Sequence, residues 1–406
     1  MQGNNIRIRE ITSIDEAREE IREISGNYQD IKENFEKLLF RTIKASDLDA
    51  RAANLLKQTA LEVGIDAIIS RDVSLFSATK SDVLILGTLN DFEKLYYKLK
   101  TKPFELSNFA EGMKEILLKY DNELSKIKIG NNNFDFNTKT YVMGILNLTP
   151  DSFSDGGKYI DVDEAVKKAK EIERDGADII DIGAESSRPG ADKVSIEEEL
   201  ERLNRVVDKI KEAVNIPISI DTYKAEVAEA MLKKGIRIIN DITGLKGDSK
   251  MADVISDYNA VAIIMHMQGV PQTMQNSPVY DEIIGDIIND FKSSIRIAQI
   301  AGIKDKNLIL DPGIGFGKKL NHNLKILNKL SEFKTLGLPI LIGASKKSFL
   351  GKITNAGVED RKEESLAAAI VAVQNGANII RVHDVKETVK AIKIVDAVKF
   401  LEKELI

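Results

Sequence analysis

The sequence contains no cysteine and no tryptophan, and only three histidines among its 406 residues. Without cysteine, the chain can form neither disulfides nor thiolate metal sites, and it has no thiol nucleophile. No apolar run approaches the roughly 20 residues needed to span a bilayer. The first residues, MQGNNIRIRE, lack the apolar core of a signal peptide. We therefore expect a cytoplasmic protein.

The charge balance also excludes some classes of partner. The net charge is −6, with 43% hydrophobic and 30% charged residues, which is typical of a soluble globular protein. A mildly acidic chain has no general attraction for nucleic acids or for anionic membranes. Any site for an anion must therefore be local.

The first third of the chain predicts a small α/β or α+β domain. Ser13, followed by Glu16 three residues later, predicts a capping box at the start of a charged amphipathic helix. A strand-like stretch at 37–44, a helix at 47–63 and further strand-like and helical stretches follow, up to a helix near residue 120. The cluster Asn131–Asn133 breaks the periodicity, so we predict domains at 1–135 and 136–406. The sequence does not indicate a role for the first domain.

From residue 140 onward one unit recurs, a short apolar run that ends in polar residues or glycine and is followed by an amphipathic helix. The eight runs are TYVMGILN (140–147), DIIDIG (178–183), IPISID (216–221), IINDIT (238–243), VAIIMH (261–266), NLILDPG (307–313), PILIGAS (339–345) and ANIIRVHD (377–384). Nearly continuous Ile, Leu and Val are typical of parallel strands buried on both faces. Eight such units predict a (β/α)8 barrel, with a doubly wound open sheet as the alternative.

Polar residues stand at or just after the end of every run. They are Asn147; Glu185, Ser187 and Arg188 after Gly183; Asp221; Asn240 and Asp241; His266; Asp311; Ser345 with Lys347; and Arg381 with His383. A single residue of this kind is better explained as a helix cap or a loop hydrogen bond than as part of a site. In a barrel, however, all eight ends meet at one face, where the active site forms. His322 begins a helix and is expected to be a surface or capping residue.

The chemistry of these residues suggests two groups. Asp221, Asn240, Asp311 and Lys347 could line a slot for a planar heterocycle, whose buried edge atoms all need hydrogen-bonding partners. Arg188, Arg381 and His383 suit phosphate oxygens.

The sequence DPGIGFGK (311–318) could bring backbone close to a flat ligand, with Phe316 packed on its face, although a sharp turn alone explains its glycines. A Mg²⁺ ion held mainly by substrate phosphates and by an oxygen such as that of Asn147 is plausible.

These motifs closely resemble those of the dihydropteroate synthase family. The resemblance rests on MGILNLTPDSFSDGG (143–157), DIGAESSRPGA (181–191), SIDTYKAEVA, INDITG, MHMQG, LDPGIGFGK, GASKKSFLG and IIRVHDV, in the family's order. It covers residues 140 to 400. It implies a homodimer that joins 6-hydroxymethyl-7,8-dihydropterin pyrophosphate to p-aminobenzoate with Mg²⁺, and a target for sulfonamides.

The resemblance also implies roles for individual residues. The pterin would contact Asp221, Asn240, Met265, Asp311, Phe316 and Lys347, and the pyrophosphate would contact Asn147, Arg188, Arg381 and His383, with Asn147 also on the metal. The p-aminobenzoate pocket would comprise Phe153, Ser187, Arg188, Pro189, Lys347 and Ser348. The catalytic set would be Asp151, Lys347, Arg381 and His383.

The implied mechanism is dissociative, with C–O cleavage before attack by the amine, and Asp151 would stabilise the cationic pterin methylene. A turn-forming aspartate after proline explains Asp151 equally well. The sequence departs from the family pattern at Lys346, Ser187 and Ala184, which affects drug sensitivity and loop packing more than the class of reaction.

Three other functions remain as alternatives. A methyltetrahydrofolate-dependent corrinoid methyltransferase would share the pterin slot but would not need the loops TPDSFSDGG and SSRPGA. A Schiff-base aldolase would rest on Lys347 alone. A non-catalytic barrel could retain pterin binding as a regulator.

Overall fold

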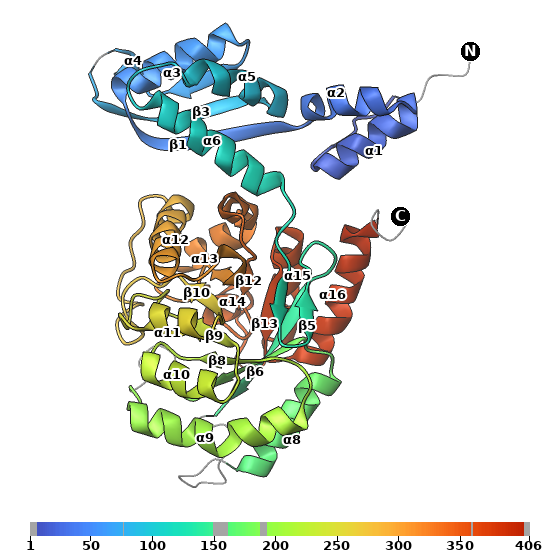
Figure 1. The fold of residues 1–406 in the computed structure, drawn as a ribbon, viewed down its shortest axis with the longest axis vertical. Coiled ribbons are helices and arrows are strands. Elements are labelled where there is room, and N and C mark those ends of the chain that lie inside the picture. Colours follow the sequence, from blue (N-terminus) through green and yellow to red (C-terminus); the bar gives the residue numbers. More distant parts are fainter. Residues whose placement is uncertain (1–5, 76, 149–160, 187–192, 359, 402–406) are drawn as a thin grey trace. The chain divides into compact units, whose positions relative to one another are not determined.

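The computed structural model describes residues 6–75, 77–148, 161–186, 193–358 and 360–401. The candidate residues Asp151, Phe153, Ser187, Arg188 and Pro189 lie outside this part of the chain. The chain divides into two compact units, Met1–Asn122 and Glu123–Ile406 (Figure 1). The predicted boundary near residue 135 falls within the second of these units.

The first unit contains a three-stranded antiparallel sheet in the order β1-β3-β2. Its elements are α1 (Ile14–Ser25), α2 (Tyr28–Leu38), β1 (Phe40–Asp49), α3 (Ala50–Glu62), β2 (Asp66–Ile69), α4 (Arg71–Ser74), β3 (Lys80–Thr88), α5 (Leu89–Leu99) and α6 (Leu106–Asp121). Helices α3 and α5 contact the sheet, and α6 packs on α5. Leu56, Ile85 and Phe92 lie in their shared core.

Local capping explains where helices of this unit begin and end. The hydroxyl of Ser13 accepts the backbone N–H of Glu16, as the capping-box pattern predicts, and the Glu16 carboxylate accepts the backbone N–H of Thr12. Gly26, with φ of 62°, ends α1 in the left-handed conformation that glycine adopts without strain.

The second unit opens with a hairpin of β4 (Ile127–Ile129) and β5 (Asn132–Phe134). The cluster Asn131–Asn133, predicted as a domain boundary, contributes to its turn and second strand. The hairpin residues Ile127, Ile129 and Phe134 share one apolar cluster with side chains from the first halves of the barrel strands, such as Met143. The hairpin therefore packs against the amino-terminal end of the barrel.

The eight predicted runs all form parallel strands of one sheet, so the (β/α)8 prediction is confirmed. The strands are β6 (Tyr141–Asn147), β7 (Ile179–Gly183), β8 (Ile218–Asp221), β9 (Ile238–Asp241), β10 (Val261–Met265), β11 (Leu308–Asp311), β12 (Leu341–Ile342) and β13 (Ile379–Val382). Their order is β11-β10-β9-β8-β7-β6-β13-β12, and one parallel bridge, Leu310 with Ile340, joins β11 to the start of β12. The ring is nearly closed, so the open-sheet alternative is wrong.

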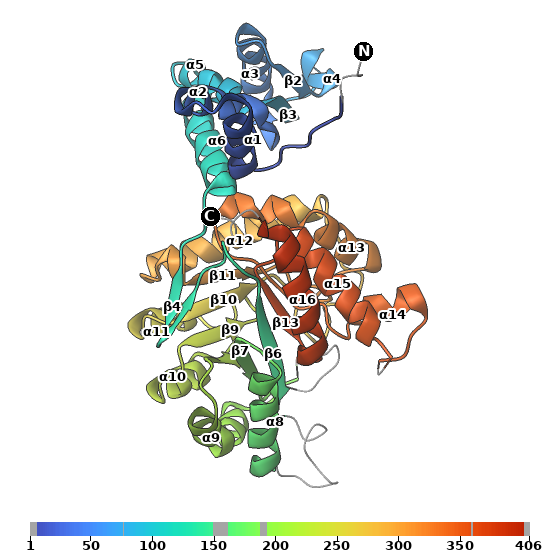
Figure 2. The same ribbon diagram turned by 90° about the vertical axis from the view of Figure 1, so that its right-hand side faces the viewer.

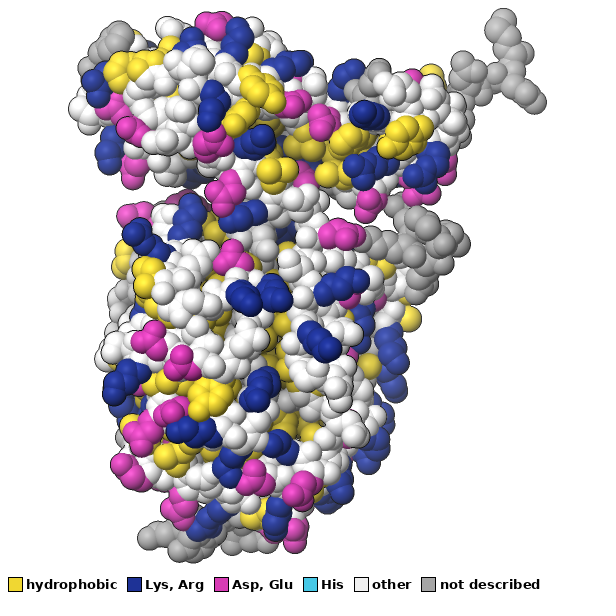
Figure 3. All heavy atoms as spheres, viewed as in Figure 1, with side chains coloured by type: hydrophobic (Ala, Val, Ile, Leu, Met, Phe, Trp, Pro, Cys, Tyr) yellow, Lys and Arg dark blue, Asp and Glu magenta, His cyan; other side chains and the backbone are white. Residues whose placement is uncertain are grey.

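Helices surround the strands (Figures 1 and 2). They are α8 (Val162–Arg174), α9 (Ile196–Ala213), α10 (Ala225–Lys233), α11 (Met251–Asp257), α12 (Ile283–Ile300), α13 (Leu320–Asn328), α14 (Ser348–Thr354), α15 (Lys362–Gln374) and α16 (Val385–Lys399), with 3₁₀ turns η1 (Asp305–Asn307) and η2 (Leu330–Leu336). On the face in Figure 3, Lys and Arg side chains are interspersed with Asp and Glu. Among the described residues, no helix is long and apolar enough to cross a membrane.

The barrel interior changes character along the strands. Because alternate residues of a strand share a face, Ile179 and Asp181 of β7 point the same way, as do Ile379 and Arg381 of β13. Ile179 and Ile379 belong to the apolar cluster beneath the hairpin, whereas Asp181 and Arg381 are bonded to each other. The carboxyl-terminal half of the barrel is therefore polar inside, and this half positions the site.

Gly144 of β6 allows two helices to approach the barrel wall. A Cβ atom there would lie 2.5 Å from Ile172 Cγ2 of α8 and 3.0 Å from Val385 Cγ2 of α16. We predict that Gly144→Ala lowers the free energy of unfolding by about 1–3 kcal/mol through overpacking. Chemical denaturation measures this. Gly112→Ala in α6, where a Cβ meets nothing within 4 Å, is the control, and equal stability of Gly144→Ala and wild type would contradict the packing.

Candidate active site

The guanidinium of Arg381 lies at the centre of the polar half of the barrel. Its Nε donates to Asp181 Oδ2 at 2.6 Å, and its Nη2 donates to Asp221 Oδ2 at 2.9 Å. The Asp181 side chain is fully buried, and that of Asp221 is 15% exposed. One arginine thus joins three strands, β7 at its middle residue Asp181 and β8 and β13 near their carboxyl ends.

Asp181 was not among the predicted site residues. Its Oδ2 also accepts a hydrogen bond from Asn240 Nδ2 at 3.1 Å, which connects β9 to the same cluster. A signal was present in the sequence, because a carboxylate in the middle of the apolar run DIIDIG must be paired when buried. Asp181 orients both Arg381 and Asn240.

Asp311 and Lys347 form the opposite side of the cluster. Asp311 lies at the end of β11, and its Oδ1 accepts the N–H of Gly313 at 2.8 Å. The Lys347 ammonium lies 4.1 Å from the centre of the Phe316 ring. Phe316 packs in an apolar cluster with Met265, Met274 and Ile242. These residues place a flat apolar surface beside buried hydrogen-bonding groups.

The glycine-rich turn after β11 depends on close backbone contacts. Gly313 has φ of 69°, and a Cβ there would lie 2.0 Å from the carbonyl oxygen of His266. Lys318, buried at the end of this turn, donates to the Phe316 carbonyl at 3.0 Å and lies 2.9 Å from His266 Nδ1. Burial is the main cause that lowers the pKa of Lys318 to about 7 and holds the pKa of His266 well below its usual range. His266 thus holds the turn from within the protein.

Two further strand ends complete the mouth. The side chains of Asn147 and Asp221 both lie close to Gly183. A Cβ atom built on this glycine would be 3.7 Å from Asn147 Oδ1 and 3.8 Å from Asp221 Oδ2. On the other side, His383 Nδ1 lies 3.1 Å from the hydroxyl of Ser345. Ser348 is exposed at the start of α14.

The charges of this cluster perturb one another. Burial is the main cause that raises the pKa of Asp221, to about 7, while Arg381 opposes the shift and Asp181 adds to it. Burial likewise raises the pKa of Asp311, against the opposing effect of Lys347. The raised pKa values mean that further negative charge is unfavourable around these carboxylates, which favours a ligand that offers several N–H donors to them.

The oxygens at the mouth could contribute to binding Mg²⁺ but do not form a complete protein cage. No group of three or more His, Cys, Asp or Glu suited to a metal occurs in the described part of the chain. Asn147 offers one amide oxygen, and the nearby Asp221 carboxylate is bonded to Arg381. This donor set fits an ion that takes most of its ligands from a phosphate-bearing substrate and water.

The predicted site residues within the described part therefore converge, with one change in grouping. Arg381 was predicted to stand apart with the phosphate-binding residues, but its guanidinium bonds directly to Asp221 of the predicted heterocycle slot. His322 caps α13 as predicted, since its Nδ1 accepts the N–H of Lys319 at 3.2 Å. Asp151, Phe153, Ser187, Arg188 and Pro189 lie outside the described residues.

Comparison with known families defines the class of protein. The family model described as "Pterin binding enzyme" matches residues 143–383. Together with the barrel and its buried polar mouth, this makes the chain a pterin-binding barrel enzyme.

Comparison with individual relatives identifies the family more specifically. The chain is 48% identical over 273 residues to dihydropteroate synthase of Clostridium beijerinckii, covering 67% of this chain and 99% of that protein. It is 47% identical over 264 residues to dihydropteroate synthase of Bacillus subtilis, covering 64% and 90%. The chain belongs to the dihydropteroate synthase family, transferases of folate biosynthesis.

Solved structures agree with this assignment. The crystal structure of Yersinia pestis dihydropteroate synthase with a sulfonamide drug matches with a TM-score of 0.64 and 42% identity, covering 68% of this chain and 99% of that one. The Clostridium difficile enzyme in the presence of pteroic acid matches with a TM-score of 0.62 and 46% identity, covering 65% and 98%. The Xanthomonas albilineans enzyme in complex with 7,8-dihydropteroate matches with a TM-score of 0.61 and 34% identity, covering 68% and 99%.

One relative also matches beyond the barrel. A probable bifunctional folylpolyglutamate synthase/dihydropteroate synthase of Haloferax volcanii is 38% identical over 355 residues, which is 85% of this chain and 42% of that protein. This alignment is longer than the second unit, Glu123–Ile406. Sequence similarity therefore extends into the first unit.

Lys318 offers a direct test of how the glycine-rich turn is held. We predict that Lys318→Met lowers the free energy of unfolding by about 1–3 kcal/mol, because it leaves the buried Phe316 carbonyl and the His266 ring without their donor. Urea denaturation measures the change. Lys319→Met, at the exposed neighbouring position, is the control. Equal stability of the two variants would show that Lys318 does not hold the turn.

Proposed function

We propose that the mouth of the barrel binds 6-hydroxymethyl-7,8-dihydropterin pyrophosphate and transfers its pterinylmethyl group to p-aminobenzoate, releasing pyrophosphate. The observation that carries the proposal is the buried set of Asp221, Asn240 and Asp311 around one arginine and one lysine.

The pterin ring would occupy the slot between the carboxylates. A dihydropterin presents ring N–H and amino groups along one edge, and carboxylate oxygens at Asp221 and Asp311 can accept from them. Asn240 can both donate and accept, and it is held in place by Asp181. The ring faces would pack against Phe316 and Met265, both almost fully buried.

The pyrophosphate would lie at the cationic side of the mouth. A guanidinium has five N–H donors, and the two bonds from Arg381 to Asp181 and Asp221 use two of them. The remaining donors of Arg381, with His383, Asn147 and Arg188, would bind phosphate oxygens. Asn147 would also contribute its amide oxygen to a bound Mg²⁺, which when present neutralises charge on the leaving group.

The chemical step needs no covalent nucleophile. The bond between the pterin methylene carbon and the pyrophosphate oxygen breaks, and its electron pair leaves with pyrophosphate. The amine nitrogen of p-aminobenzoate then bonds to the methylene carbon and loses a proton. Asp151 would stabilise the cationic methylene, and Lys347, between Phe316 and the carboxylates, would help to orient the pterin.

The second substrate would approach from the outer loops. We assign p-aminobenzoate to Phe153, Ser187, Arg188, Pro189, Lys347 and Ser348. The relatives support such a site, since the Yersinia pestis enzyme is described with a sulfonamide drug and the Xanthomonas albilineans enzyme with 7,8-dihydropteroate. The homodimer and the cytoplasmic location expected from the sequence remain predictions.

Turnover tests the proposed function. With labelled p-aminobenzoate, pterin pyrophosphate and Mg²⁺, we expect the wild type to form dihydropteroate and Asp221→Ala to lose roughly 100-fold in kcat/KM, since it removes a charged hydrogen-bonding partner of the ring. Asp253→Ala, on the outer face of α11, is the matched control. If the folded wild type binds pterin but makes no product, the synthase function fails, and methyltransfer from methyltetrahydrofolate to a corrinoid or a regulatory role would be tested next.

The affinity for the pterin should depend on pH. The pKa of Asp221 is raised to about 7, chiefly by burial, and its ionised form accepts N–H donors of the ring through both oxygens with full negative charge, whereas protonation turns one oxygen into a donor. We therefore expect the affinity for 6-hydroxymethyl-7,8-dihydropterin to be constant well above pH 7 and to fall roughly tenfold per pH unit below it. Calorimetric titration from pH 5 to 9 measures this. Asp221→Asn should bind more weakly and lose this slope; an unchanged slope in the variant would assign the titration to another group.

A further inference from the structure

The short turn between β12 and α14 contains a residue with an unusual backbone conformation. Lys346 has φ of 57°, in the left-handed region that residues other than glycine rarely adopt. A residue stays in this conformation only where its surroundings fix it, and such residues are common at functional sites. The two neighbours of Lys346 in the chain, Ser345 and Lys347, both lie at the mouth of the barrel, where they contact His383 and Phe316, respectively.

The start of α15 holds the peptide groups on both sides of Lys346. The backbone N–H of Lys346 donates to the hydroxyl of Ser365 at 2.9 Å, and its carbonyl oxygen accepts a hydrogen bond from Arg361 Nη1 at 3.2 Å. Ser365 is almost fully buried, and its hydroxyl in turn donates to the carbonyl oxygen of Arg361. Two linked side chains of one element thus fix the left-handed conformation of Lys346.

The guanidinium of Arg361 also reaches the other end of α14. Its Nε and Nη2 donate to the carbonyl oxygen of Ala356, at 3.3 Å and 3.2 Å. Gly351 of α14 leaves room for these bonds, because a Cβ atom there would lie 2.6 Å from Arg361 Nη2 and 2.5 Å from the Ala356 carbonyl oxygen. Arg361 therefore joins the residues before and after α14, and the residue at the N-cap of that helix is Lys347.

The position of the Lys347 ammonium matters for the carboxylates of the candidate slot. Burial raises the pKa of Asp221 and of Asp311, and the charge of Lys347 opposes the shift in both. The same ammonium lies 4.1 Å from the centre of the Phe316 ring. A displacement of Lys347 would therefore weaken the acceptors of the slot and disturb its apolar face together.

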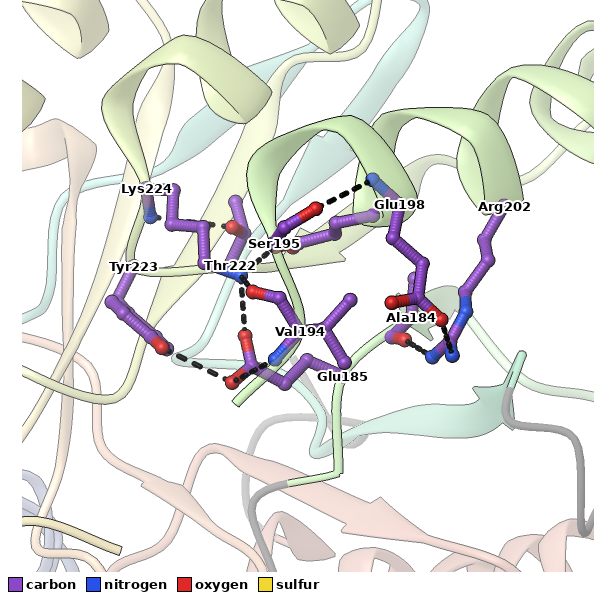
Figure 4. Close-up of polar contacts among 10 residues, drawn as sticks. Ala184, Glu185, Val194, Ser195, Glu198, Arg202, Thr222, Tyr223 and Lys224 are labelled. Atoms are coloured by element: carbon purple, nitrogen blue, oxygen red, sulfur yellow. Dashed lines mark hydrogen bonds and ion pairs between the residues drawn. The ribbon is translucent and has the colours of Figure 1, made fainter. Parts of the chain in front are cut away.

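A comparable contact lies after β7, where Arg202 of α9 donates through Nη1 to the carbonyl oxygen of Ala184 at 2.7 Å (Figure 4). Residues 187–192, further along that segment, lie outside the described part of the chain. Lys346, in contrast, is followed directly by Lys347 of the candidate slot. Of these two contacts, the one after β12 is therefore the one that the described residues connect to the slot.

We propose that Arg361 and Ser365 are positioning residues for the pterin slot. By holding the backbone of Lys346, they place the ammonium of Lys347 beside the carboxylates and over the Phe316 ring, and thereby increase the affinity for the pterin. Both act through Lys347 and not by contact with the substrate. The inference rests on the proposed function, since it presumes that the slot binds a pterin.

A double-mutant cycle tests whether Arg361 acts through Lys347. The four proteins are the wild type, Arg361→Met, Lys347→Met and the double variant, and calorimetric titration measures the Kd for 6-hydroxymethyl-7,8-dihydropterin. We expect each single variant to raise Kd about tenfold, because displacing a positioned group is costly. The double variant should bind at most about twofold more weakly than Lys347→Met, because Arg361 then has no ammonium left to position.

Ser365→Ala repeats the cycle with the loss of one hydroxyl, and each variant has a matched control. The control for Arg361→Met is Arg237→Met, which removes an arginine that also donates to two backbone carbonyls, before β9. The control for Ser365→Ala is Ser293→Ala in α12, whose hydroxyl likewise donates to the carbonyl oxygen one turn earlier. Both controls should bind the pterin as the wild type does. The unfolding temperature of every variant is measured in parallel.

Each outcome is decisive. If folded Arg361→Met and Ser365→Ala bind the pterin as tightly as the wild type, the proposal is overturned, and a lower unfolding temperature alone would mark a purely structural contact. Effects that add in the double variant overturn it as well, because Arg361 would then act independently of Lys347. If Arg361→Met does not fold, Ser365→Ala decides by the same cycle.

Failure of the proposed function gives a different result. If the wild type does not bind the dihydropterin, or if Lys347→Met binds it unchanged, the proposed slot fails and this inference fails with it. A wild type whose affinity depends on Lys347 but not on Arg361 or Ser365 overturns only this inference.

Discussion

The ion cluster of Arg381 with Asp181 and Asp221 is the interaction on which the rest of the site depends. It joins β7, β8 and β13 inside the barrel, and Asp181 extends it to Asn240 of β9. Burying these charges is costly unless each finds its partner. Their mutual pairing therefore fixes four strand ends and prepares a polar, preorganised surface in the interior, where electrostatic interactions with a substrate are strongest.

The two ends of the barrel differ in composition and in role. At the amino ends of the strands, Met143, Ile179 and Ile379 pack beneath the β4–β5 hairpin and supply apolar stability. At the carboxyl ends, the same strands carry Asp181 and Arg381 two residues later. Residues two positions apart on a strand face the same side. An apolar layer that stabilises the barrel and a polar layer that forms the candidate site therefore lie within four or five residues of chain.

The sequence predicts the barrel well because buried parallel strands are almost wholly apolar and each is followed by a helix. It predicts the first unit less accurately. The helix expected at 47–63 begins at Ala50, because β1 continues past an irregularity between Ala45 and Leu48 and Asp49 then caps α3. Such an irregularity depends on pairing with β3, which is distant in sequence. The second unit begins before the predicted boundary, since the hairpin packs on the barrel.

For the site, strand ends are visible in the sequence but pairings are not. The convergence of Asp221, Asn240, Asp311 and Lys347 follows from barrel topology alone. That Arg381 bonds Asp181 and Asp221, and that Lys224 bonds Glu185 and Glu199, depends on which strands are neighbours and how far each side chain reaches. The sequence did not predict Asp181 as a site residue, because it lies inside an apolar run rather than at its end.

We propose that the buried carboxylates around Arg381 form the pterin slot. A crystal structure of the chain with 6-hydroxymethyl-7,8-dihydropterin bound would test this. We expect the ring edge in hydrogen-bonding contact with Asp221, Asn240 and Asp311, with Phe316 and Met265 against its faces. A pterin bound elsewhere, with these residues making only the contacts seen without ligand, would contradict it.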